Sequence, residues 1–399
     1  MKKYILIILC CLTSFPLWSY NVNMIVEHYS VDQGLPNNTV NCTLKDRDGF
    51  IWFGTWYGLC CFDGVKFKTF NKQEHDSDVP PRKIQRIVED KNGYIWVKTI
   101  DRKLYVFNKV TECFHAVYDD MKNYSENIQV IKLQNTAEGD VLLLTKDKNL
   151  LLAGVDEKGQ VTIKILFDSR DEINKHDYTL KHHVLCETEE YISWIGTDYK
   201  VSAVHKGAEL ASRPADFITS KINSGDKDSF TSFFEDGRKV WVGDRAGIFY
   251  SIDVRTGLVN RYVLSEIKGA ISNLLVTPAG YVYLSVTGQG TYEYDLAERR
   301  LQKINTEMND AMVTHAFIDQ YDKIWFHENE KALIYYDPLN HTAKRFPFTM
   351  FGKITTLYSE DAGERGLFFL SPAGEAWLFD RQHAEMVYIN KLKQLSNDR

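Results

Sequence analysis

A segment of roughly 45 residues recurs along the chain, and this internal repeat constrains the fold more than any other feature. The clearest copy is Asp46–Thr55, where Asp-Arg-Asp-Gly precedes Phe-Ile-Trp-Phe-Gly-Thr, and the next copy ends in Ile95–Thr99. Their tryptophans, Trp52 and Trp96, are 44 residues apart. Weaker copies place the equivalent position at Leu142, Trp194, Trp241, Tyr283, Trp325 and near Phe368. The chain is therefore predicted to contain eight units.

Each unit is predicted to form four antiparallel strands. An alternating strand such as Val40–Leu44 meets a turn rich in Asp, Asn and Gly, and a second strand carries the tryptophan. A third strand ends in an aromatic residue and Asp, and a fourth alternates Lys with Phe or Tyr. Four-stranded units at this period indicate a β-propeller, in which the recurring tryptophan is a wedge between blades.

We expect a seven-bladed propeller over residues 21–351. An early strand at Glu27–Val31 is expected to close the ring. The eighth unit, residues 352–399, then begins a second propeller, or closes the first as an additional blade.

The N-terminus resembles an export signal. Lys2 and Lys3 precede an apolar run from Tyr4 to Leu12, which is too short to span a membrane. We expect a signal peptide at residues 1–20 and a location in the periplasm. The remaining five cysteines form an odd set without framework spacing. The net charge of −6 argues against a nucleic-acid partner.

The repeat, with Asp-x-x-Gly-x-Ile-Trp-x-Gly-Thr followed by Gly-Leu and an aromatic-Asp pair, resembles the regulator-propeller repeat of bacterial two-component sensors. The segment Tyr29–Val40 is similar to the start of the extracytoplasmic sensor of Bacteroides-type hybrid two-component systems. In that family two seven-bladed propellers and an immunoglobulin-like domain precede a membrane helix, a histidine kinase and a response regulator.

The resemblance implies a sensor for oligosaccharides released from complex glycans. It also implies a homodimer, formed through the full-length receptor and anchored in the inner membrane only by C-terminal regions beyond this chain. The chain has no kinase motif and no receiver aspartate, so we expect the N-terminal part of such a receptor and no enzymatic activity.

No catalytic residue, metal site or cofactor is predicted. The carboxylates lie where turn chemistry accounts for them: Asp46, Asp48, Asp90, Asp236 and Asp322 in first turns, and Asp63, Asn108, Asp253, Asp295, Asp337 and Asp380 after third strands. His182 and His183 are neighbours on a strand, so their rings would point to opposite faces and one metal ion could not easily take both.

The loops that follow second strands, together with the connections between blades, are predicted to carry the function. Aromatic rings suit the apolar face of a sugar, and Arg and Lys suit sulfate or uronate groups. The candidate ligand-binding residues on these loops are Trp56, Tyr57, Arg82, Arg102, Tyr199, Lys200 and Arg245. For Trp56 and Tyr57 the alternative is packing against a neighbouring blade or propeller.

Three functions remain open at the level of sequence. The favoured one is a periplasmic sensor module that binds a glycan fragment. A structural or protein-binding propeller would instead show a contiguous apolar patch on the loop face. A polysaccharide hydrolase or lyase would need carboxylates or a Tyr-His pair converging in the channel.

Overall fold

In the computed structural model, most of the described residues lie in short antiparallel strands. The structure describes residues 29–70, 81–121, 129–146, 149–167, 180–188, 190–196, 201–207, 215–216, 230–304, 313–328, 331–351, 358–361, 366–371 and 375–391. The expected signal peptide lies outside these residues.

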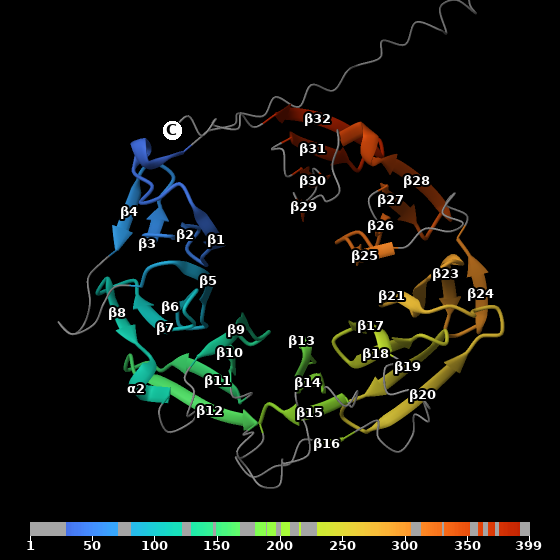
Figure 1. The fold of residues 1–399 in the computed structure, drawn as a ribbon, viewed down its shortest axis with the longest axis horizontal. Coiled ribbons are helices and arrows are strands. Elements are labelled where there is room, and N and C mark those ends of the chain that lie inside the picture. Colours follow the sequence, from blue (N-terminus) through green and yellow to red (C-terminus); the bar gives the residue numbers. More distant parts are fainter. Residues whose placement is uncertain are drawn as a thin grey trace, which may run out of the picture. The chain divides into compact units, whose positions relative to one another are not determined.

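The described strands form eight four-stranded sheets, each in simple sequence order (Figure 1). The first sheet contains β1 (Val40–Lys45), β2 (Ile51–Thr55), β3 (Gly58–Phe62) and β4 (Phe67–Phe70). The second contains β5 (Ile84–Glu89), β6 (Ile95–Thr99), β7 (Leu104–Asn108) and β8 (Cys113–Ala116), followed by the short helix α2 (Tyr118–Met121). The third contains β9 (Val130–Asn135), β10 (Val141–Thr145), β11 (Leu150–Val155) and β12 (Val161–Phe167).

The remaining five sheets repeat this order. The fourth contains β13 (Leu180–Glu187), β14 (Tyr191–Gly196), β15 (Val201–His205) and β16 (Ala215–Asp216). The fifth contains β17 (Phe230–Glu235), β18 (Lys239–Asp244), β19 (Ile248–Asp253) and β20 (Leu258–Val263). The sixth contains β21 (Ile271–Val276), β22 (Tyr281–Val286), β23 (Gly290–Asp295) and β24 (Arg300–Lys303).

The seventh sheet contains β25 (Val313–Ile318), β26 (Ile324–Glu328), β27 (Ala332–Asp337) and β28 (Thr342–Pro347), followed by the 3-10 helix η3 (Phe348–Phe351). The eighth contains β29 (Tyr358–Asp361), β30 (Gly366–Leu370), β31 (Glu375–Asp380) and β32 (Glu385–Lys391). Every repeat position identified from the sequence lies on the second strand of its sheet, so the predicted four-stranded units are confirmed.

The described residues belong to two compact units, divided between Arg345 and Phe346. Within residues 29–345, the first strands of successive sheets lie side by side, as the first strands of propeller blades do (Figure 1). Strand β1 contacts β5, β5 contacts β9, and β21 contacts both β17 and β25. The boundaries at residues 20 and 351 and the seven-blade count stay predictions.

The recurring tryptophan is the predicted wedge between sheets. Trp52 is buried, and its ring centroid lies 5.5 Å from that of Phe107 in the second sheet. Trp96 packs in one apolar cluster with Leu143 of the third sheet, and Trp241 packs with Leu284 of the sixth. The repeat therefore supplies the apolar contacts that join consecutive sheets.

Turn carboxylates such as Asp46 and Asp63 have the structural role expected of them. Asp46 accepts hydrogen bonds from the backbone N–H groups of Asp48 and Phe50 at 3.0 and 2.9 Å. Asp63, after the third strand, accepts from Val65 and Lys66 at 2.9 and 2.8 Å. These bonds close the tight turns, as Asx turns do.

The prediction of a strand at Glu27–Val31 is wrong for the part of this segment that the structure describes, residues 29–31. Val31–Gln33 form a 3-10 helix, η1, rather than a strand. Ser30 caps it: its hydroxyl accepts the Asp32 N–H at 3.2 Å, and the Gln33 side chain accepts the Ser30 N–H at 2.7 Å. Gly34 then ends the helix in the left-handed conformation. Glu27 and His28 lie outside the described residues.

Candidate ligand-binding site

The loop between β2 and β3 presents two large aromatic side chains to solvent. Trp56 is 39% exposed and Tyr57 is 60% exposed. The ammonium nitrogen of Lys83 lies 5.5 Å from the centroid of the Trp56 ring, so a cation–π contact holds this ring against the connection that precedes β5. The predicted pair thus lies on the surface with one cation over an aromatic face.

Backbone hydrogen bonds join this loop to its neighbours. The Lys83 N–H donates to the carbonyl of Trp56, and the Ile100 N–H donates to the carbonyl of Lys83, both at 2.9 Å. The loop after β6 is bound to the next connection in the same way: the Val130 N–H donates to the carbonyl of Arg102 at 3.0 Å. The loops after β2 and β6 are therefore each held against the connection to the following sheet.

The structure brings together some of the predicted residues. Trp56, Tyr57 and Arg82 lie on adjoining segments, and Arg102 follows within the same series of hydrogen bonds. The Arg102 guanidinium donates to the Gln129 side chain at 3.4 Å. Arg245 is exposed in the turn between β18 and β19 of the fifth sheet, apart from this group. Tyr199 and Lys200 lie outside the described residues.

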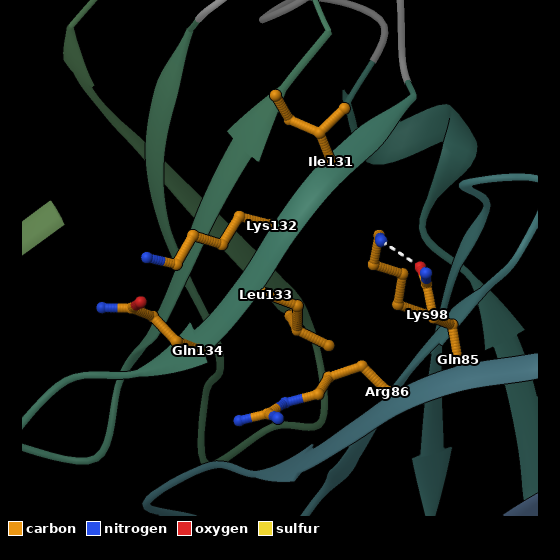
Figure 2. A pocket seen from close by; sticks show the side chains of 7 residues that line it. All are labelled: Gln85, Arg86, Lys98, Ile131, Lys132, Leu133 and Gln134. Atoms are coloured by element: carbon orange, nitrogen blue, oxygen red, sulfur yellow. Dashed lines mark hydrogen bonds between the residues drawn. The ribbon is translucent and has the colours of Figure 1, made fainter. Parts of the chain in front are cut away.

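A basic groove lies next to Arg102 on the first strands of the second and third sheets. It is open to solvent and has a volume of about 370 Å³. Figure 2 shows its lining on β5, β6 and β9. The lining residues are Gln85, Arg86, Lys98, Ile131, Lys132, Leu133 and Gln134. Three are cationic and two carry amides, whereas none carries a carboxylate.

Lys98 is the most constrained of these cations. It is 6% exposed, and its ammonium donates a hydrogen bond to the Gln85 side chain, drawn as a dashed line in Figure 2. Burial, followed by the positive charge of the nearby Arg102, lowers the pKa of Lys98 below its ordinary value. A negative ligand group in the groove would offset both effects, since an opposite charge favours the ammonium form.

The residues of this groove were not identified from the sequence, although a signal for Lys98 was present. Lys98 occupies the repeat position that is glycine in the first and fifth units, Gly54 and Gly243. A Cβ atom on Gly54 would meet Cys42 Sγ at 2.4 Å and Ile84 Cγ2 at 2.6 Å. In those units the glycine admits the next sheet, whereas the second unit places a long cation there.

Three carboxylates at the first junction between sheets are bound by a lysine. Oxygens of Asp46, Asp48 and Glu89 lie within 4.8 Å of one another, which is the spacing of a metal-binding group. The Lys109 ammonium, however, lies 3.1, 2.8 and 2.7 Å from their oxygens. The lysine supplies the positive charge that these groups require, and the cluster is a structural clamp between the first two sheets.

Comparison with known proteins supports the resemblance seen in the opening repeat. Residues 34–57 match the family model of the two component regulator propeller. No curated protein matches the chain. The chain therefore carries a two-component regulator propeller repeat, and the predicted resemblance is confirmed.

Solved structures match over most of the chain at low identity. The Dos1 propeller is 13% identical, with a TM-score of 0.52, over 84% of this chain and 90% of that one. The extracellular domain of the putative one component system BT4673 from B. thetaiotaomicron is 14% identical, with a TM-score of 0.41, over 91% of this chain and 62% of that one. Streptogramin B lyase is 13% identical, with a TM-score of 0.40, over 80% of this chain and 95% of that one. The predicted all-β propeller fold is confirmed, and the chain spans less than two thirds of the BT4673 domain.

Proposed function

We propose that the chain is an extracytoplasmic ligand-sensing module of a two-component regulatory receptor, and that its basic groove binds acidic oligosaccharides. The receptor would transmit ligand binding through altered packing between modules of a dimer. Among the described residues, no helix combines the length and apolar character needed to cross a lipid bilayer.

The buried Lys98 is the observation that carries the choice of ligand. An ammonium group with a polar amide as its partner is costly to bury, and a carboxylate or sulfate would lower that cost. Arg86 and Lys132 add charge at the same groove, and the surface ring of Trp56 lies on the adjoining loops. Cations with a nearby aromatic face suit a sugar that carries uronate or sulfate groups.

The proposed role is binding rather than catalysis. The described residues that line the groove include no carboxylate that could act as a general acid or base. Among the turn carboxylates, Asp90 is already engaged, because it accepts two backbone N–H groups and the Trp96 indole N–H.

A thermal-shift screen of the purified chain tests this proposal. The panel contains neutral, uronate-bearing and sulfated oligosaccharides in matched sizes. Acidic members should stabilise the protein, because a ligand at 100 times its dissociation constant adds roughly 2.7 kcal/mol to the free energy of unfolding. Lys98→Gln should abolish the shift, and Lys45→Gln, an exposed lysine at the end of β1, should leave it unchanged.

The outcomes separate the site from the function. If acidic oligosaccharides still stabilise Lys98→Gln, the chain binds them at a site other than the basic groove. Trp56→Ala would then be the next variant to test. A panel without any stabilisation would reject a glycan-binding role for this part of the receptor.

A protein-binding scaffold is the second candidate, and exposed apolar turn residues favour it. Val65, Val110 and Leu339 are 86%, 92% and 84% exposed, and each lies in the turn between the third and fourth strands of its sheet. Val65 and Val110 belong to neighbouring sheets, so they could form part of a contact surface. Changing both to Ser and measuring self-association by sedimentation tests whether these tips hold a second copy of the chain.

A further inference from the structure

The sixth sheet departs from the repeat at a buried position. Where five of the units carry tryptophan on the second strand, β22 carries Tyr283. The residue opposite Tyr283 on β23 is Glu293, whereas Trp52 and Trp96 face Cys61 and Val106 at the same register position. A carboxylate has thus replaced a neutral residue inside the sheet, with a side chain only 6% exposed.

Three side chains from two sheets surround this carboxylate. Tyr283 donates its hydroxyl to Glu293 Oε2 at 2.8 Å, and Tyr336 of β27 donates to the same oxygen at 3.1 Å. The other oxygen, Oε1, lies 3.9 Å from Nδ1 of His341, whose side chain is half exposed. Among the described residues, the hydrogen bonds to Glu293 thus converge on Oε2 and come from neutral donors.

A pocket of about 320 Å³ opens beside Glu293, between the sixth and seventh sheets. Its lining includes Tyr281, Tyr283, Glu293, Tyr321, Lys323 and His341. The ammonium of Lys323 is already paired, 2.7 Å from the carboxylate of Asp337. Asp322 lies at the same pocket and adds negative charge. The pocket therefore combines tyrosine rings with a carboxylate whose counter-charge is incomplete.

Comparison with the first junction between sheets shows why this pocket is open. There, Lys109 follows the third strand of the second sheet and places its ammonium among three carboxylates. In the seventh sheet the residue at the same place after the third strand is Pro338, which also lines the pocket. At the place that Lys109 occupies in the second sheet, the seventh sheet thus carries a proline and no lysine, while the carboxylate Glu293 is present at the pocket.

We infer that this pocket binds a small organic cation, with its ammonium group against Glu293 and its carbon skeleton against the tyrosine rings. An ionised carboxylate that is largely withdrawn from water needs a positive partner, and an ammonium ligand supplies one. Tyrosine faces attract the same group through cation–π contacts. The pocket is distinct from the basic groove, and its ligand has the opposite charge.

Isothermal titration of the purified chain tests this inference with matched probes. Putrescine and glucosamine are the cations, and 1,4-butanediol and glucose are their neutral counterparts. The amines should bind saturably and the neutral compounds should not. Glu293→Gln, which keeps both tyrosine hydrogen bonds, should weaken amine binding by about tenfold or more. Lys98→Gln in the basic groove should leave it unchanged.

Pro338→Lys provides a second variant that does not disturb the buried carboxylate. It reproduces the arrangement at Lys109, so the new ammonium should occupy the pocket, block the amines and raise the melting temperature. The inference is overturned if neither amine binds, if the neutral compounds bind equally well, or if amine binding survives both variants. None of these outcomes affects acidic oligosaccharide binding at Lys98, so the two proposals fail separately.

Discussion

Trp52 donates its indole N–H to Asp46 Oδ2 at 2.8 Å, although the two residues belong to different parts of the repeat. Asp46 closes the first turn with its other oxygen, while Trp52 fills the interface with the second sheet. The same pair recurs as Trp96 with Asp90 at 2.9 Å and as Trp241 with Asp236 at 2.7 Å. One aspartate thus fixes both the turn and the orientation of the interface tryptophan.

Asp90→Ala should lower the free energy of unfolding by about 1–3 kcal/mol, because it leaves the buried indole N–H of Trp96 without its acceptor. Asp156→Ala is the matched control, since Asp156 accepts only backbone N–H groups of its own turn. Urea denaturation followed by tryptophan fluorescence measures both. Equal losses in the two variants would show that the turn, and not the tryptophan pair, accounts for the effect.

Lys109→Met should destabilise the junction of the first two sheets by about 2 kcal/mol, because it removes the hydrogen bonds to three carboxylates. Lys103→Met is the control: its pair with Asp101 is 3.6 Å long and both side chains are mostly exposed, so it should cost under about 1 kcal/mol. A similar loss in both variants would reject the clamp.

The cost of Lys109→Met should depend on pH. Burial alone would raise the pKa of Asp46, but hydrogen bonds from Trp52 and Lys109 outweigh it and lower that pKa. A lowered carboxyl pKa contributes stability above the unfolded value of about 3.9, and this contribution is lost as pH falls through the folded value. The difference between wild type and Lys109→Met, measured by thermal denaturation from pH 7 to pH 3, should therefore shrink in acid. A constant difference would contradict the linkage.

The regular part of the fold could be predicted because it repeats. Trp52, Trp96 and Trp241 mark second strands through their spacing, and the same three residues belong to the apolar clusters that join neighbouring sheets. The strand expected near Val31 failed because local capping decided that segment: Ser30, Gln33 and Gly34 together stabilise a 3-10 turn. Alternating polarity over a few residues does not reveal such side-chain bonds.

The candidate sites were less predictable for a different reason. Trp56 and Tyr57 were predicted to be exposed because they lie in a loop after a second strand, and both are exposed in the structure. Lys98 and Glu293 are buried in strands, where the repeat pattern predicts only packing residues. Their signal was a departure from the repeat: a lysine at a glycine position and a glutamate opposite the tryptophan position. A repeat thus shows which positions normally serve packing. A charged residue at such a position departs from the repeat and suggests a functional role.

Binding of an acidic oligosaccharide at the groove should weaken as pH rises. Burial and Arg102 lower the pKa of Lys98, so its ammonium loses its proton below the usual pH for lysine, near 10.4. Bound anion favours the charged form and should raise that pKa, which couples binding to proton uptake. Titrations at pH 7 and pH 9 should show weaker binding at pH 9 in wild type. In Lys98→Arg, which stays charged, affinity should be nearly independent of pH over this range. An equal loss in both proteins would show that another group titrates.

Gly54→Ala should destabilise the protein measurably. Its backbone is ordinary strand, so the cost comes from space. The new Cβ would lie 2.4 Å from Cys42 Sγ of β1 in the same sheet and 2.6 Å from Ile84 Cγ2 of β5, where β2 contacts β5. Relief requires the second sheet to move away, and overpacking of this kind costs about 1–3 kcal/mol. Gly154→Ala is the control, because its Cβ would meet nothing closer than 3.5 Å. That variant should be neutral or slightly stabilising, since alanine restricts the unfolded chain. Thermal melts of both variants measure the difference, and a neutral Gly54→Ala would mean that the sheets tolerate a wider spacing than the repeat glycine implies.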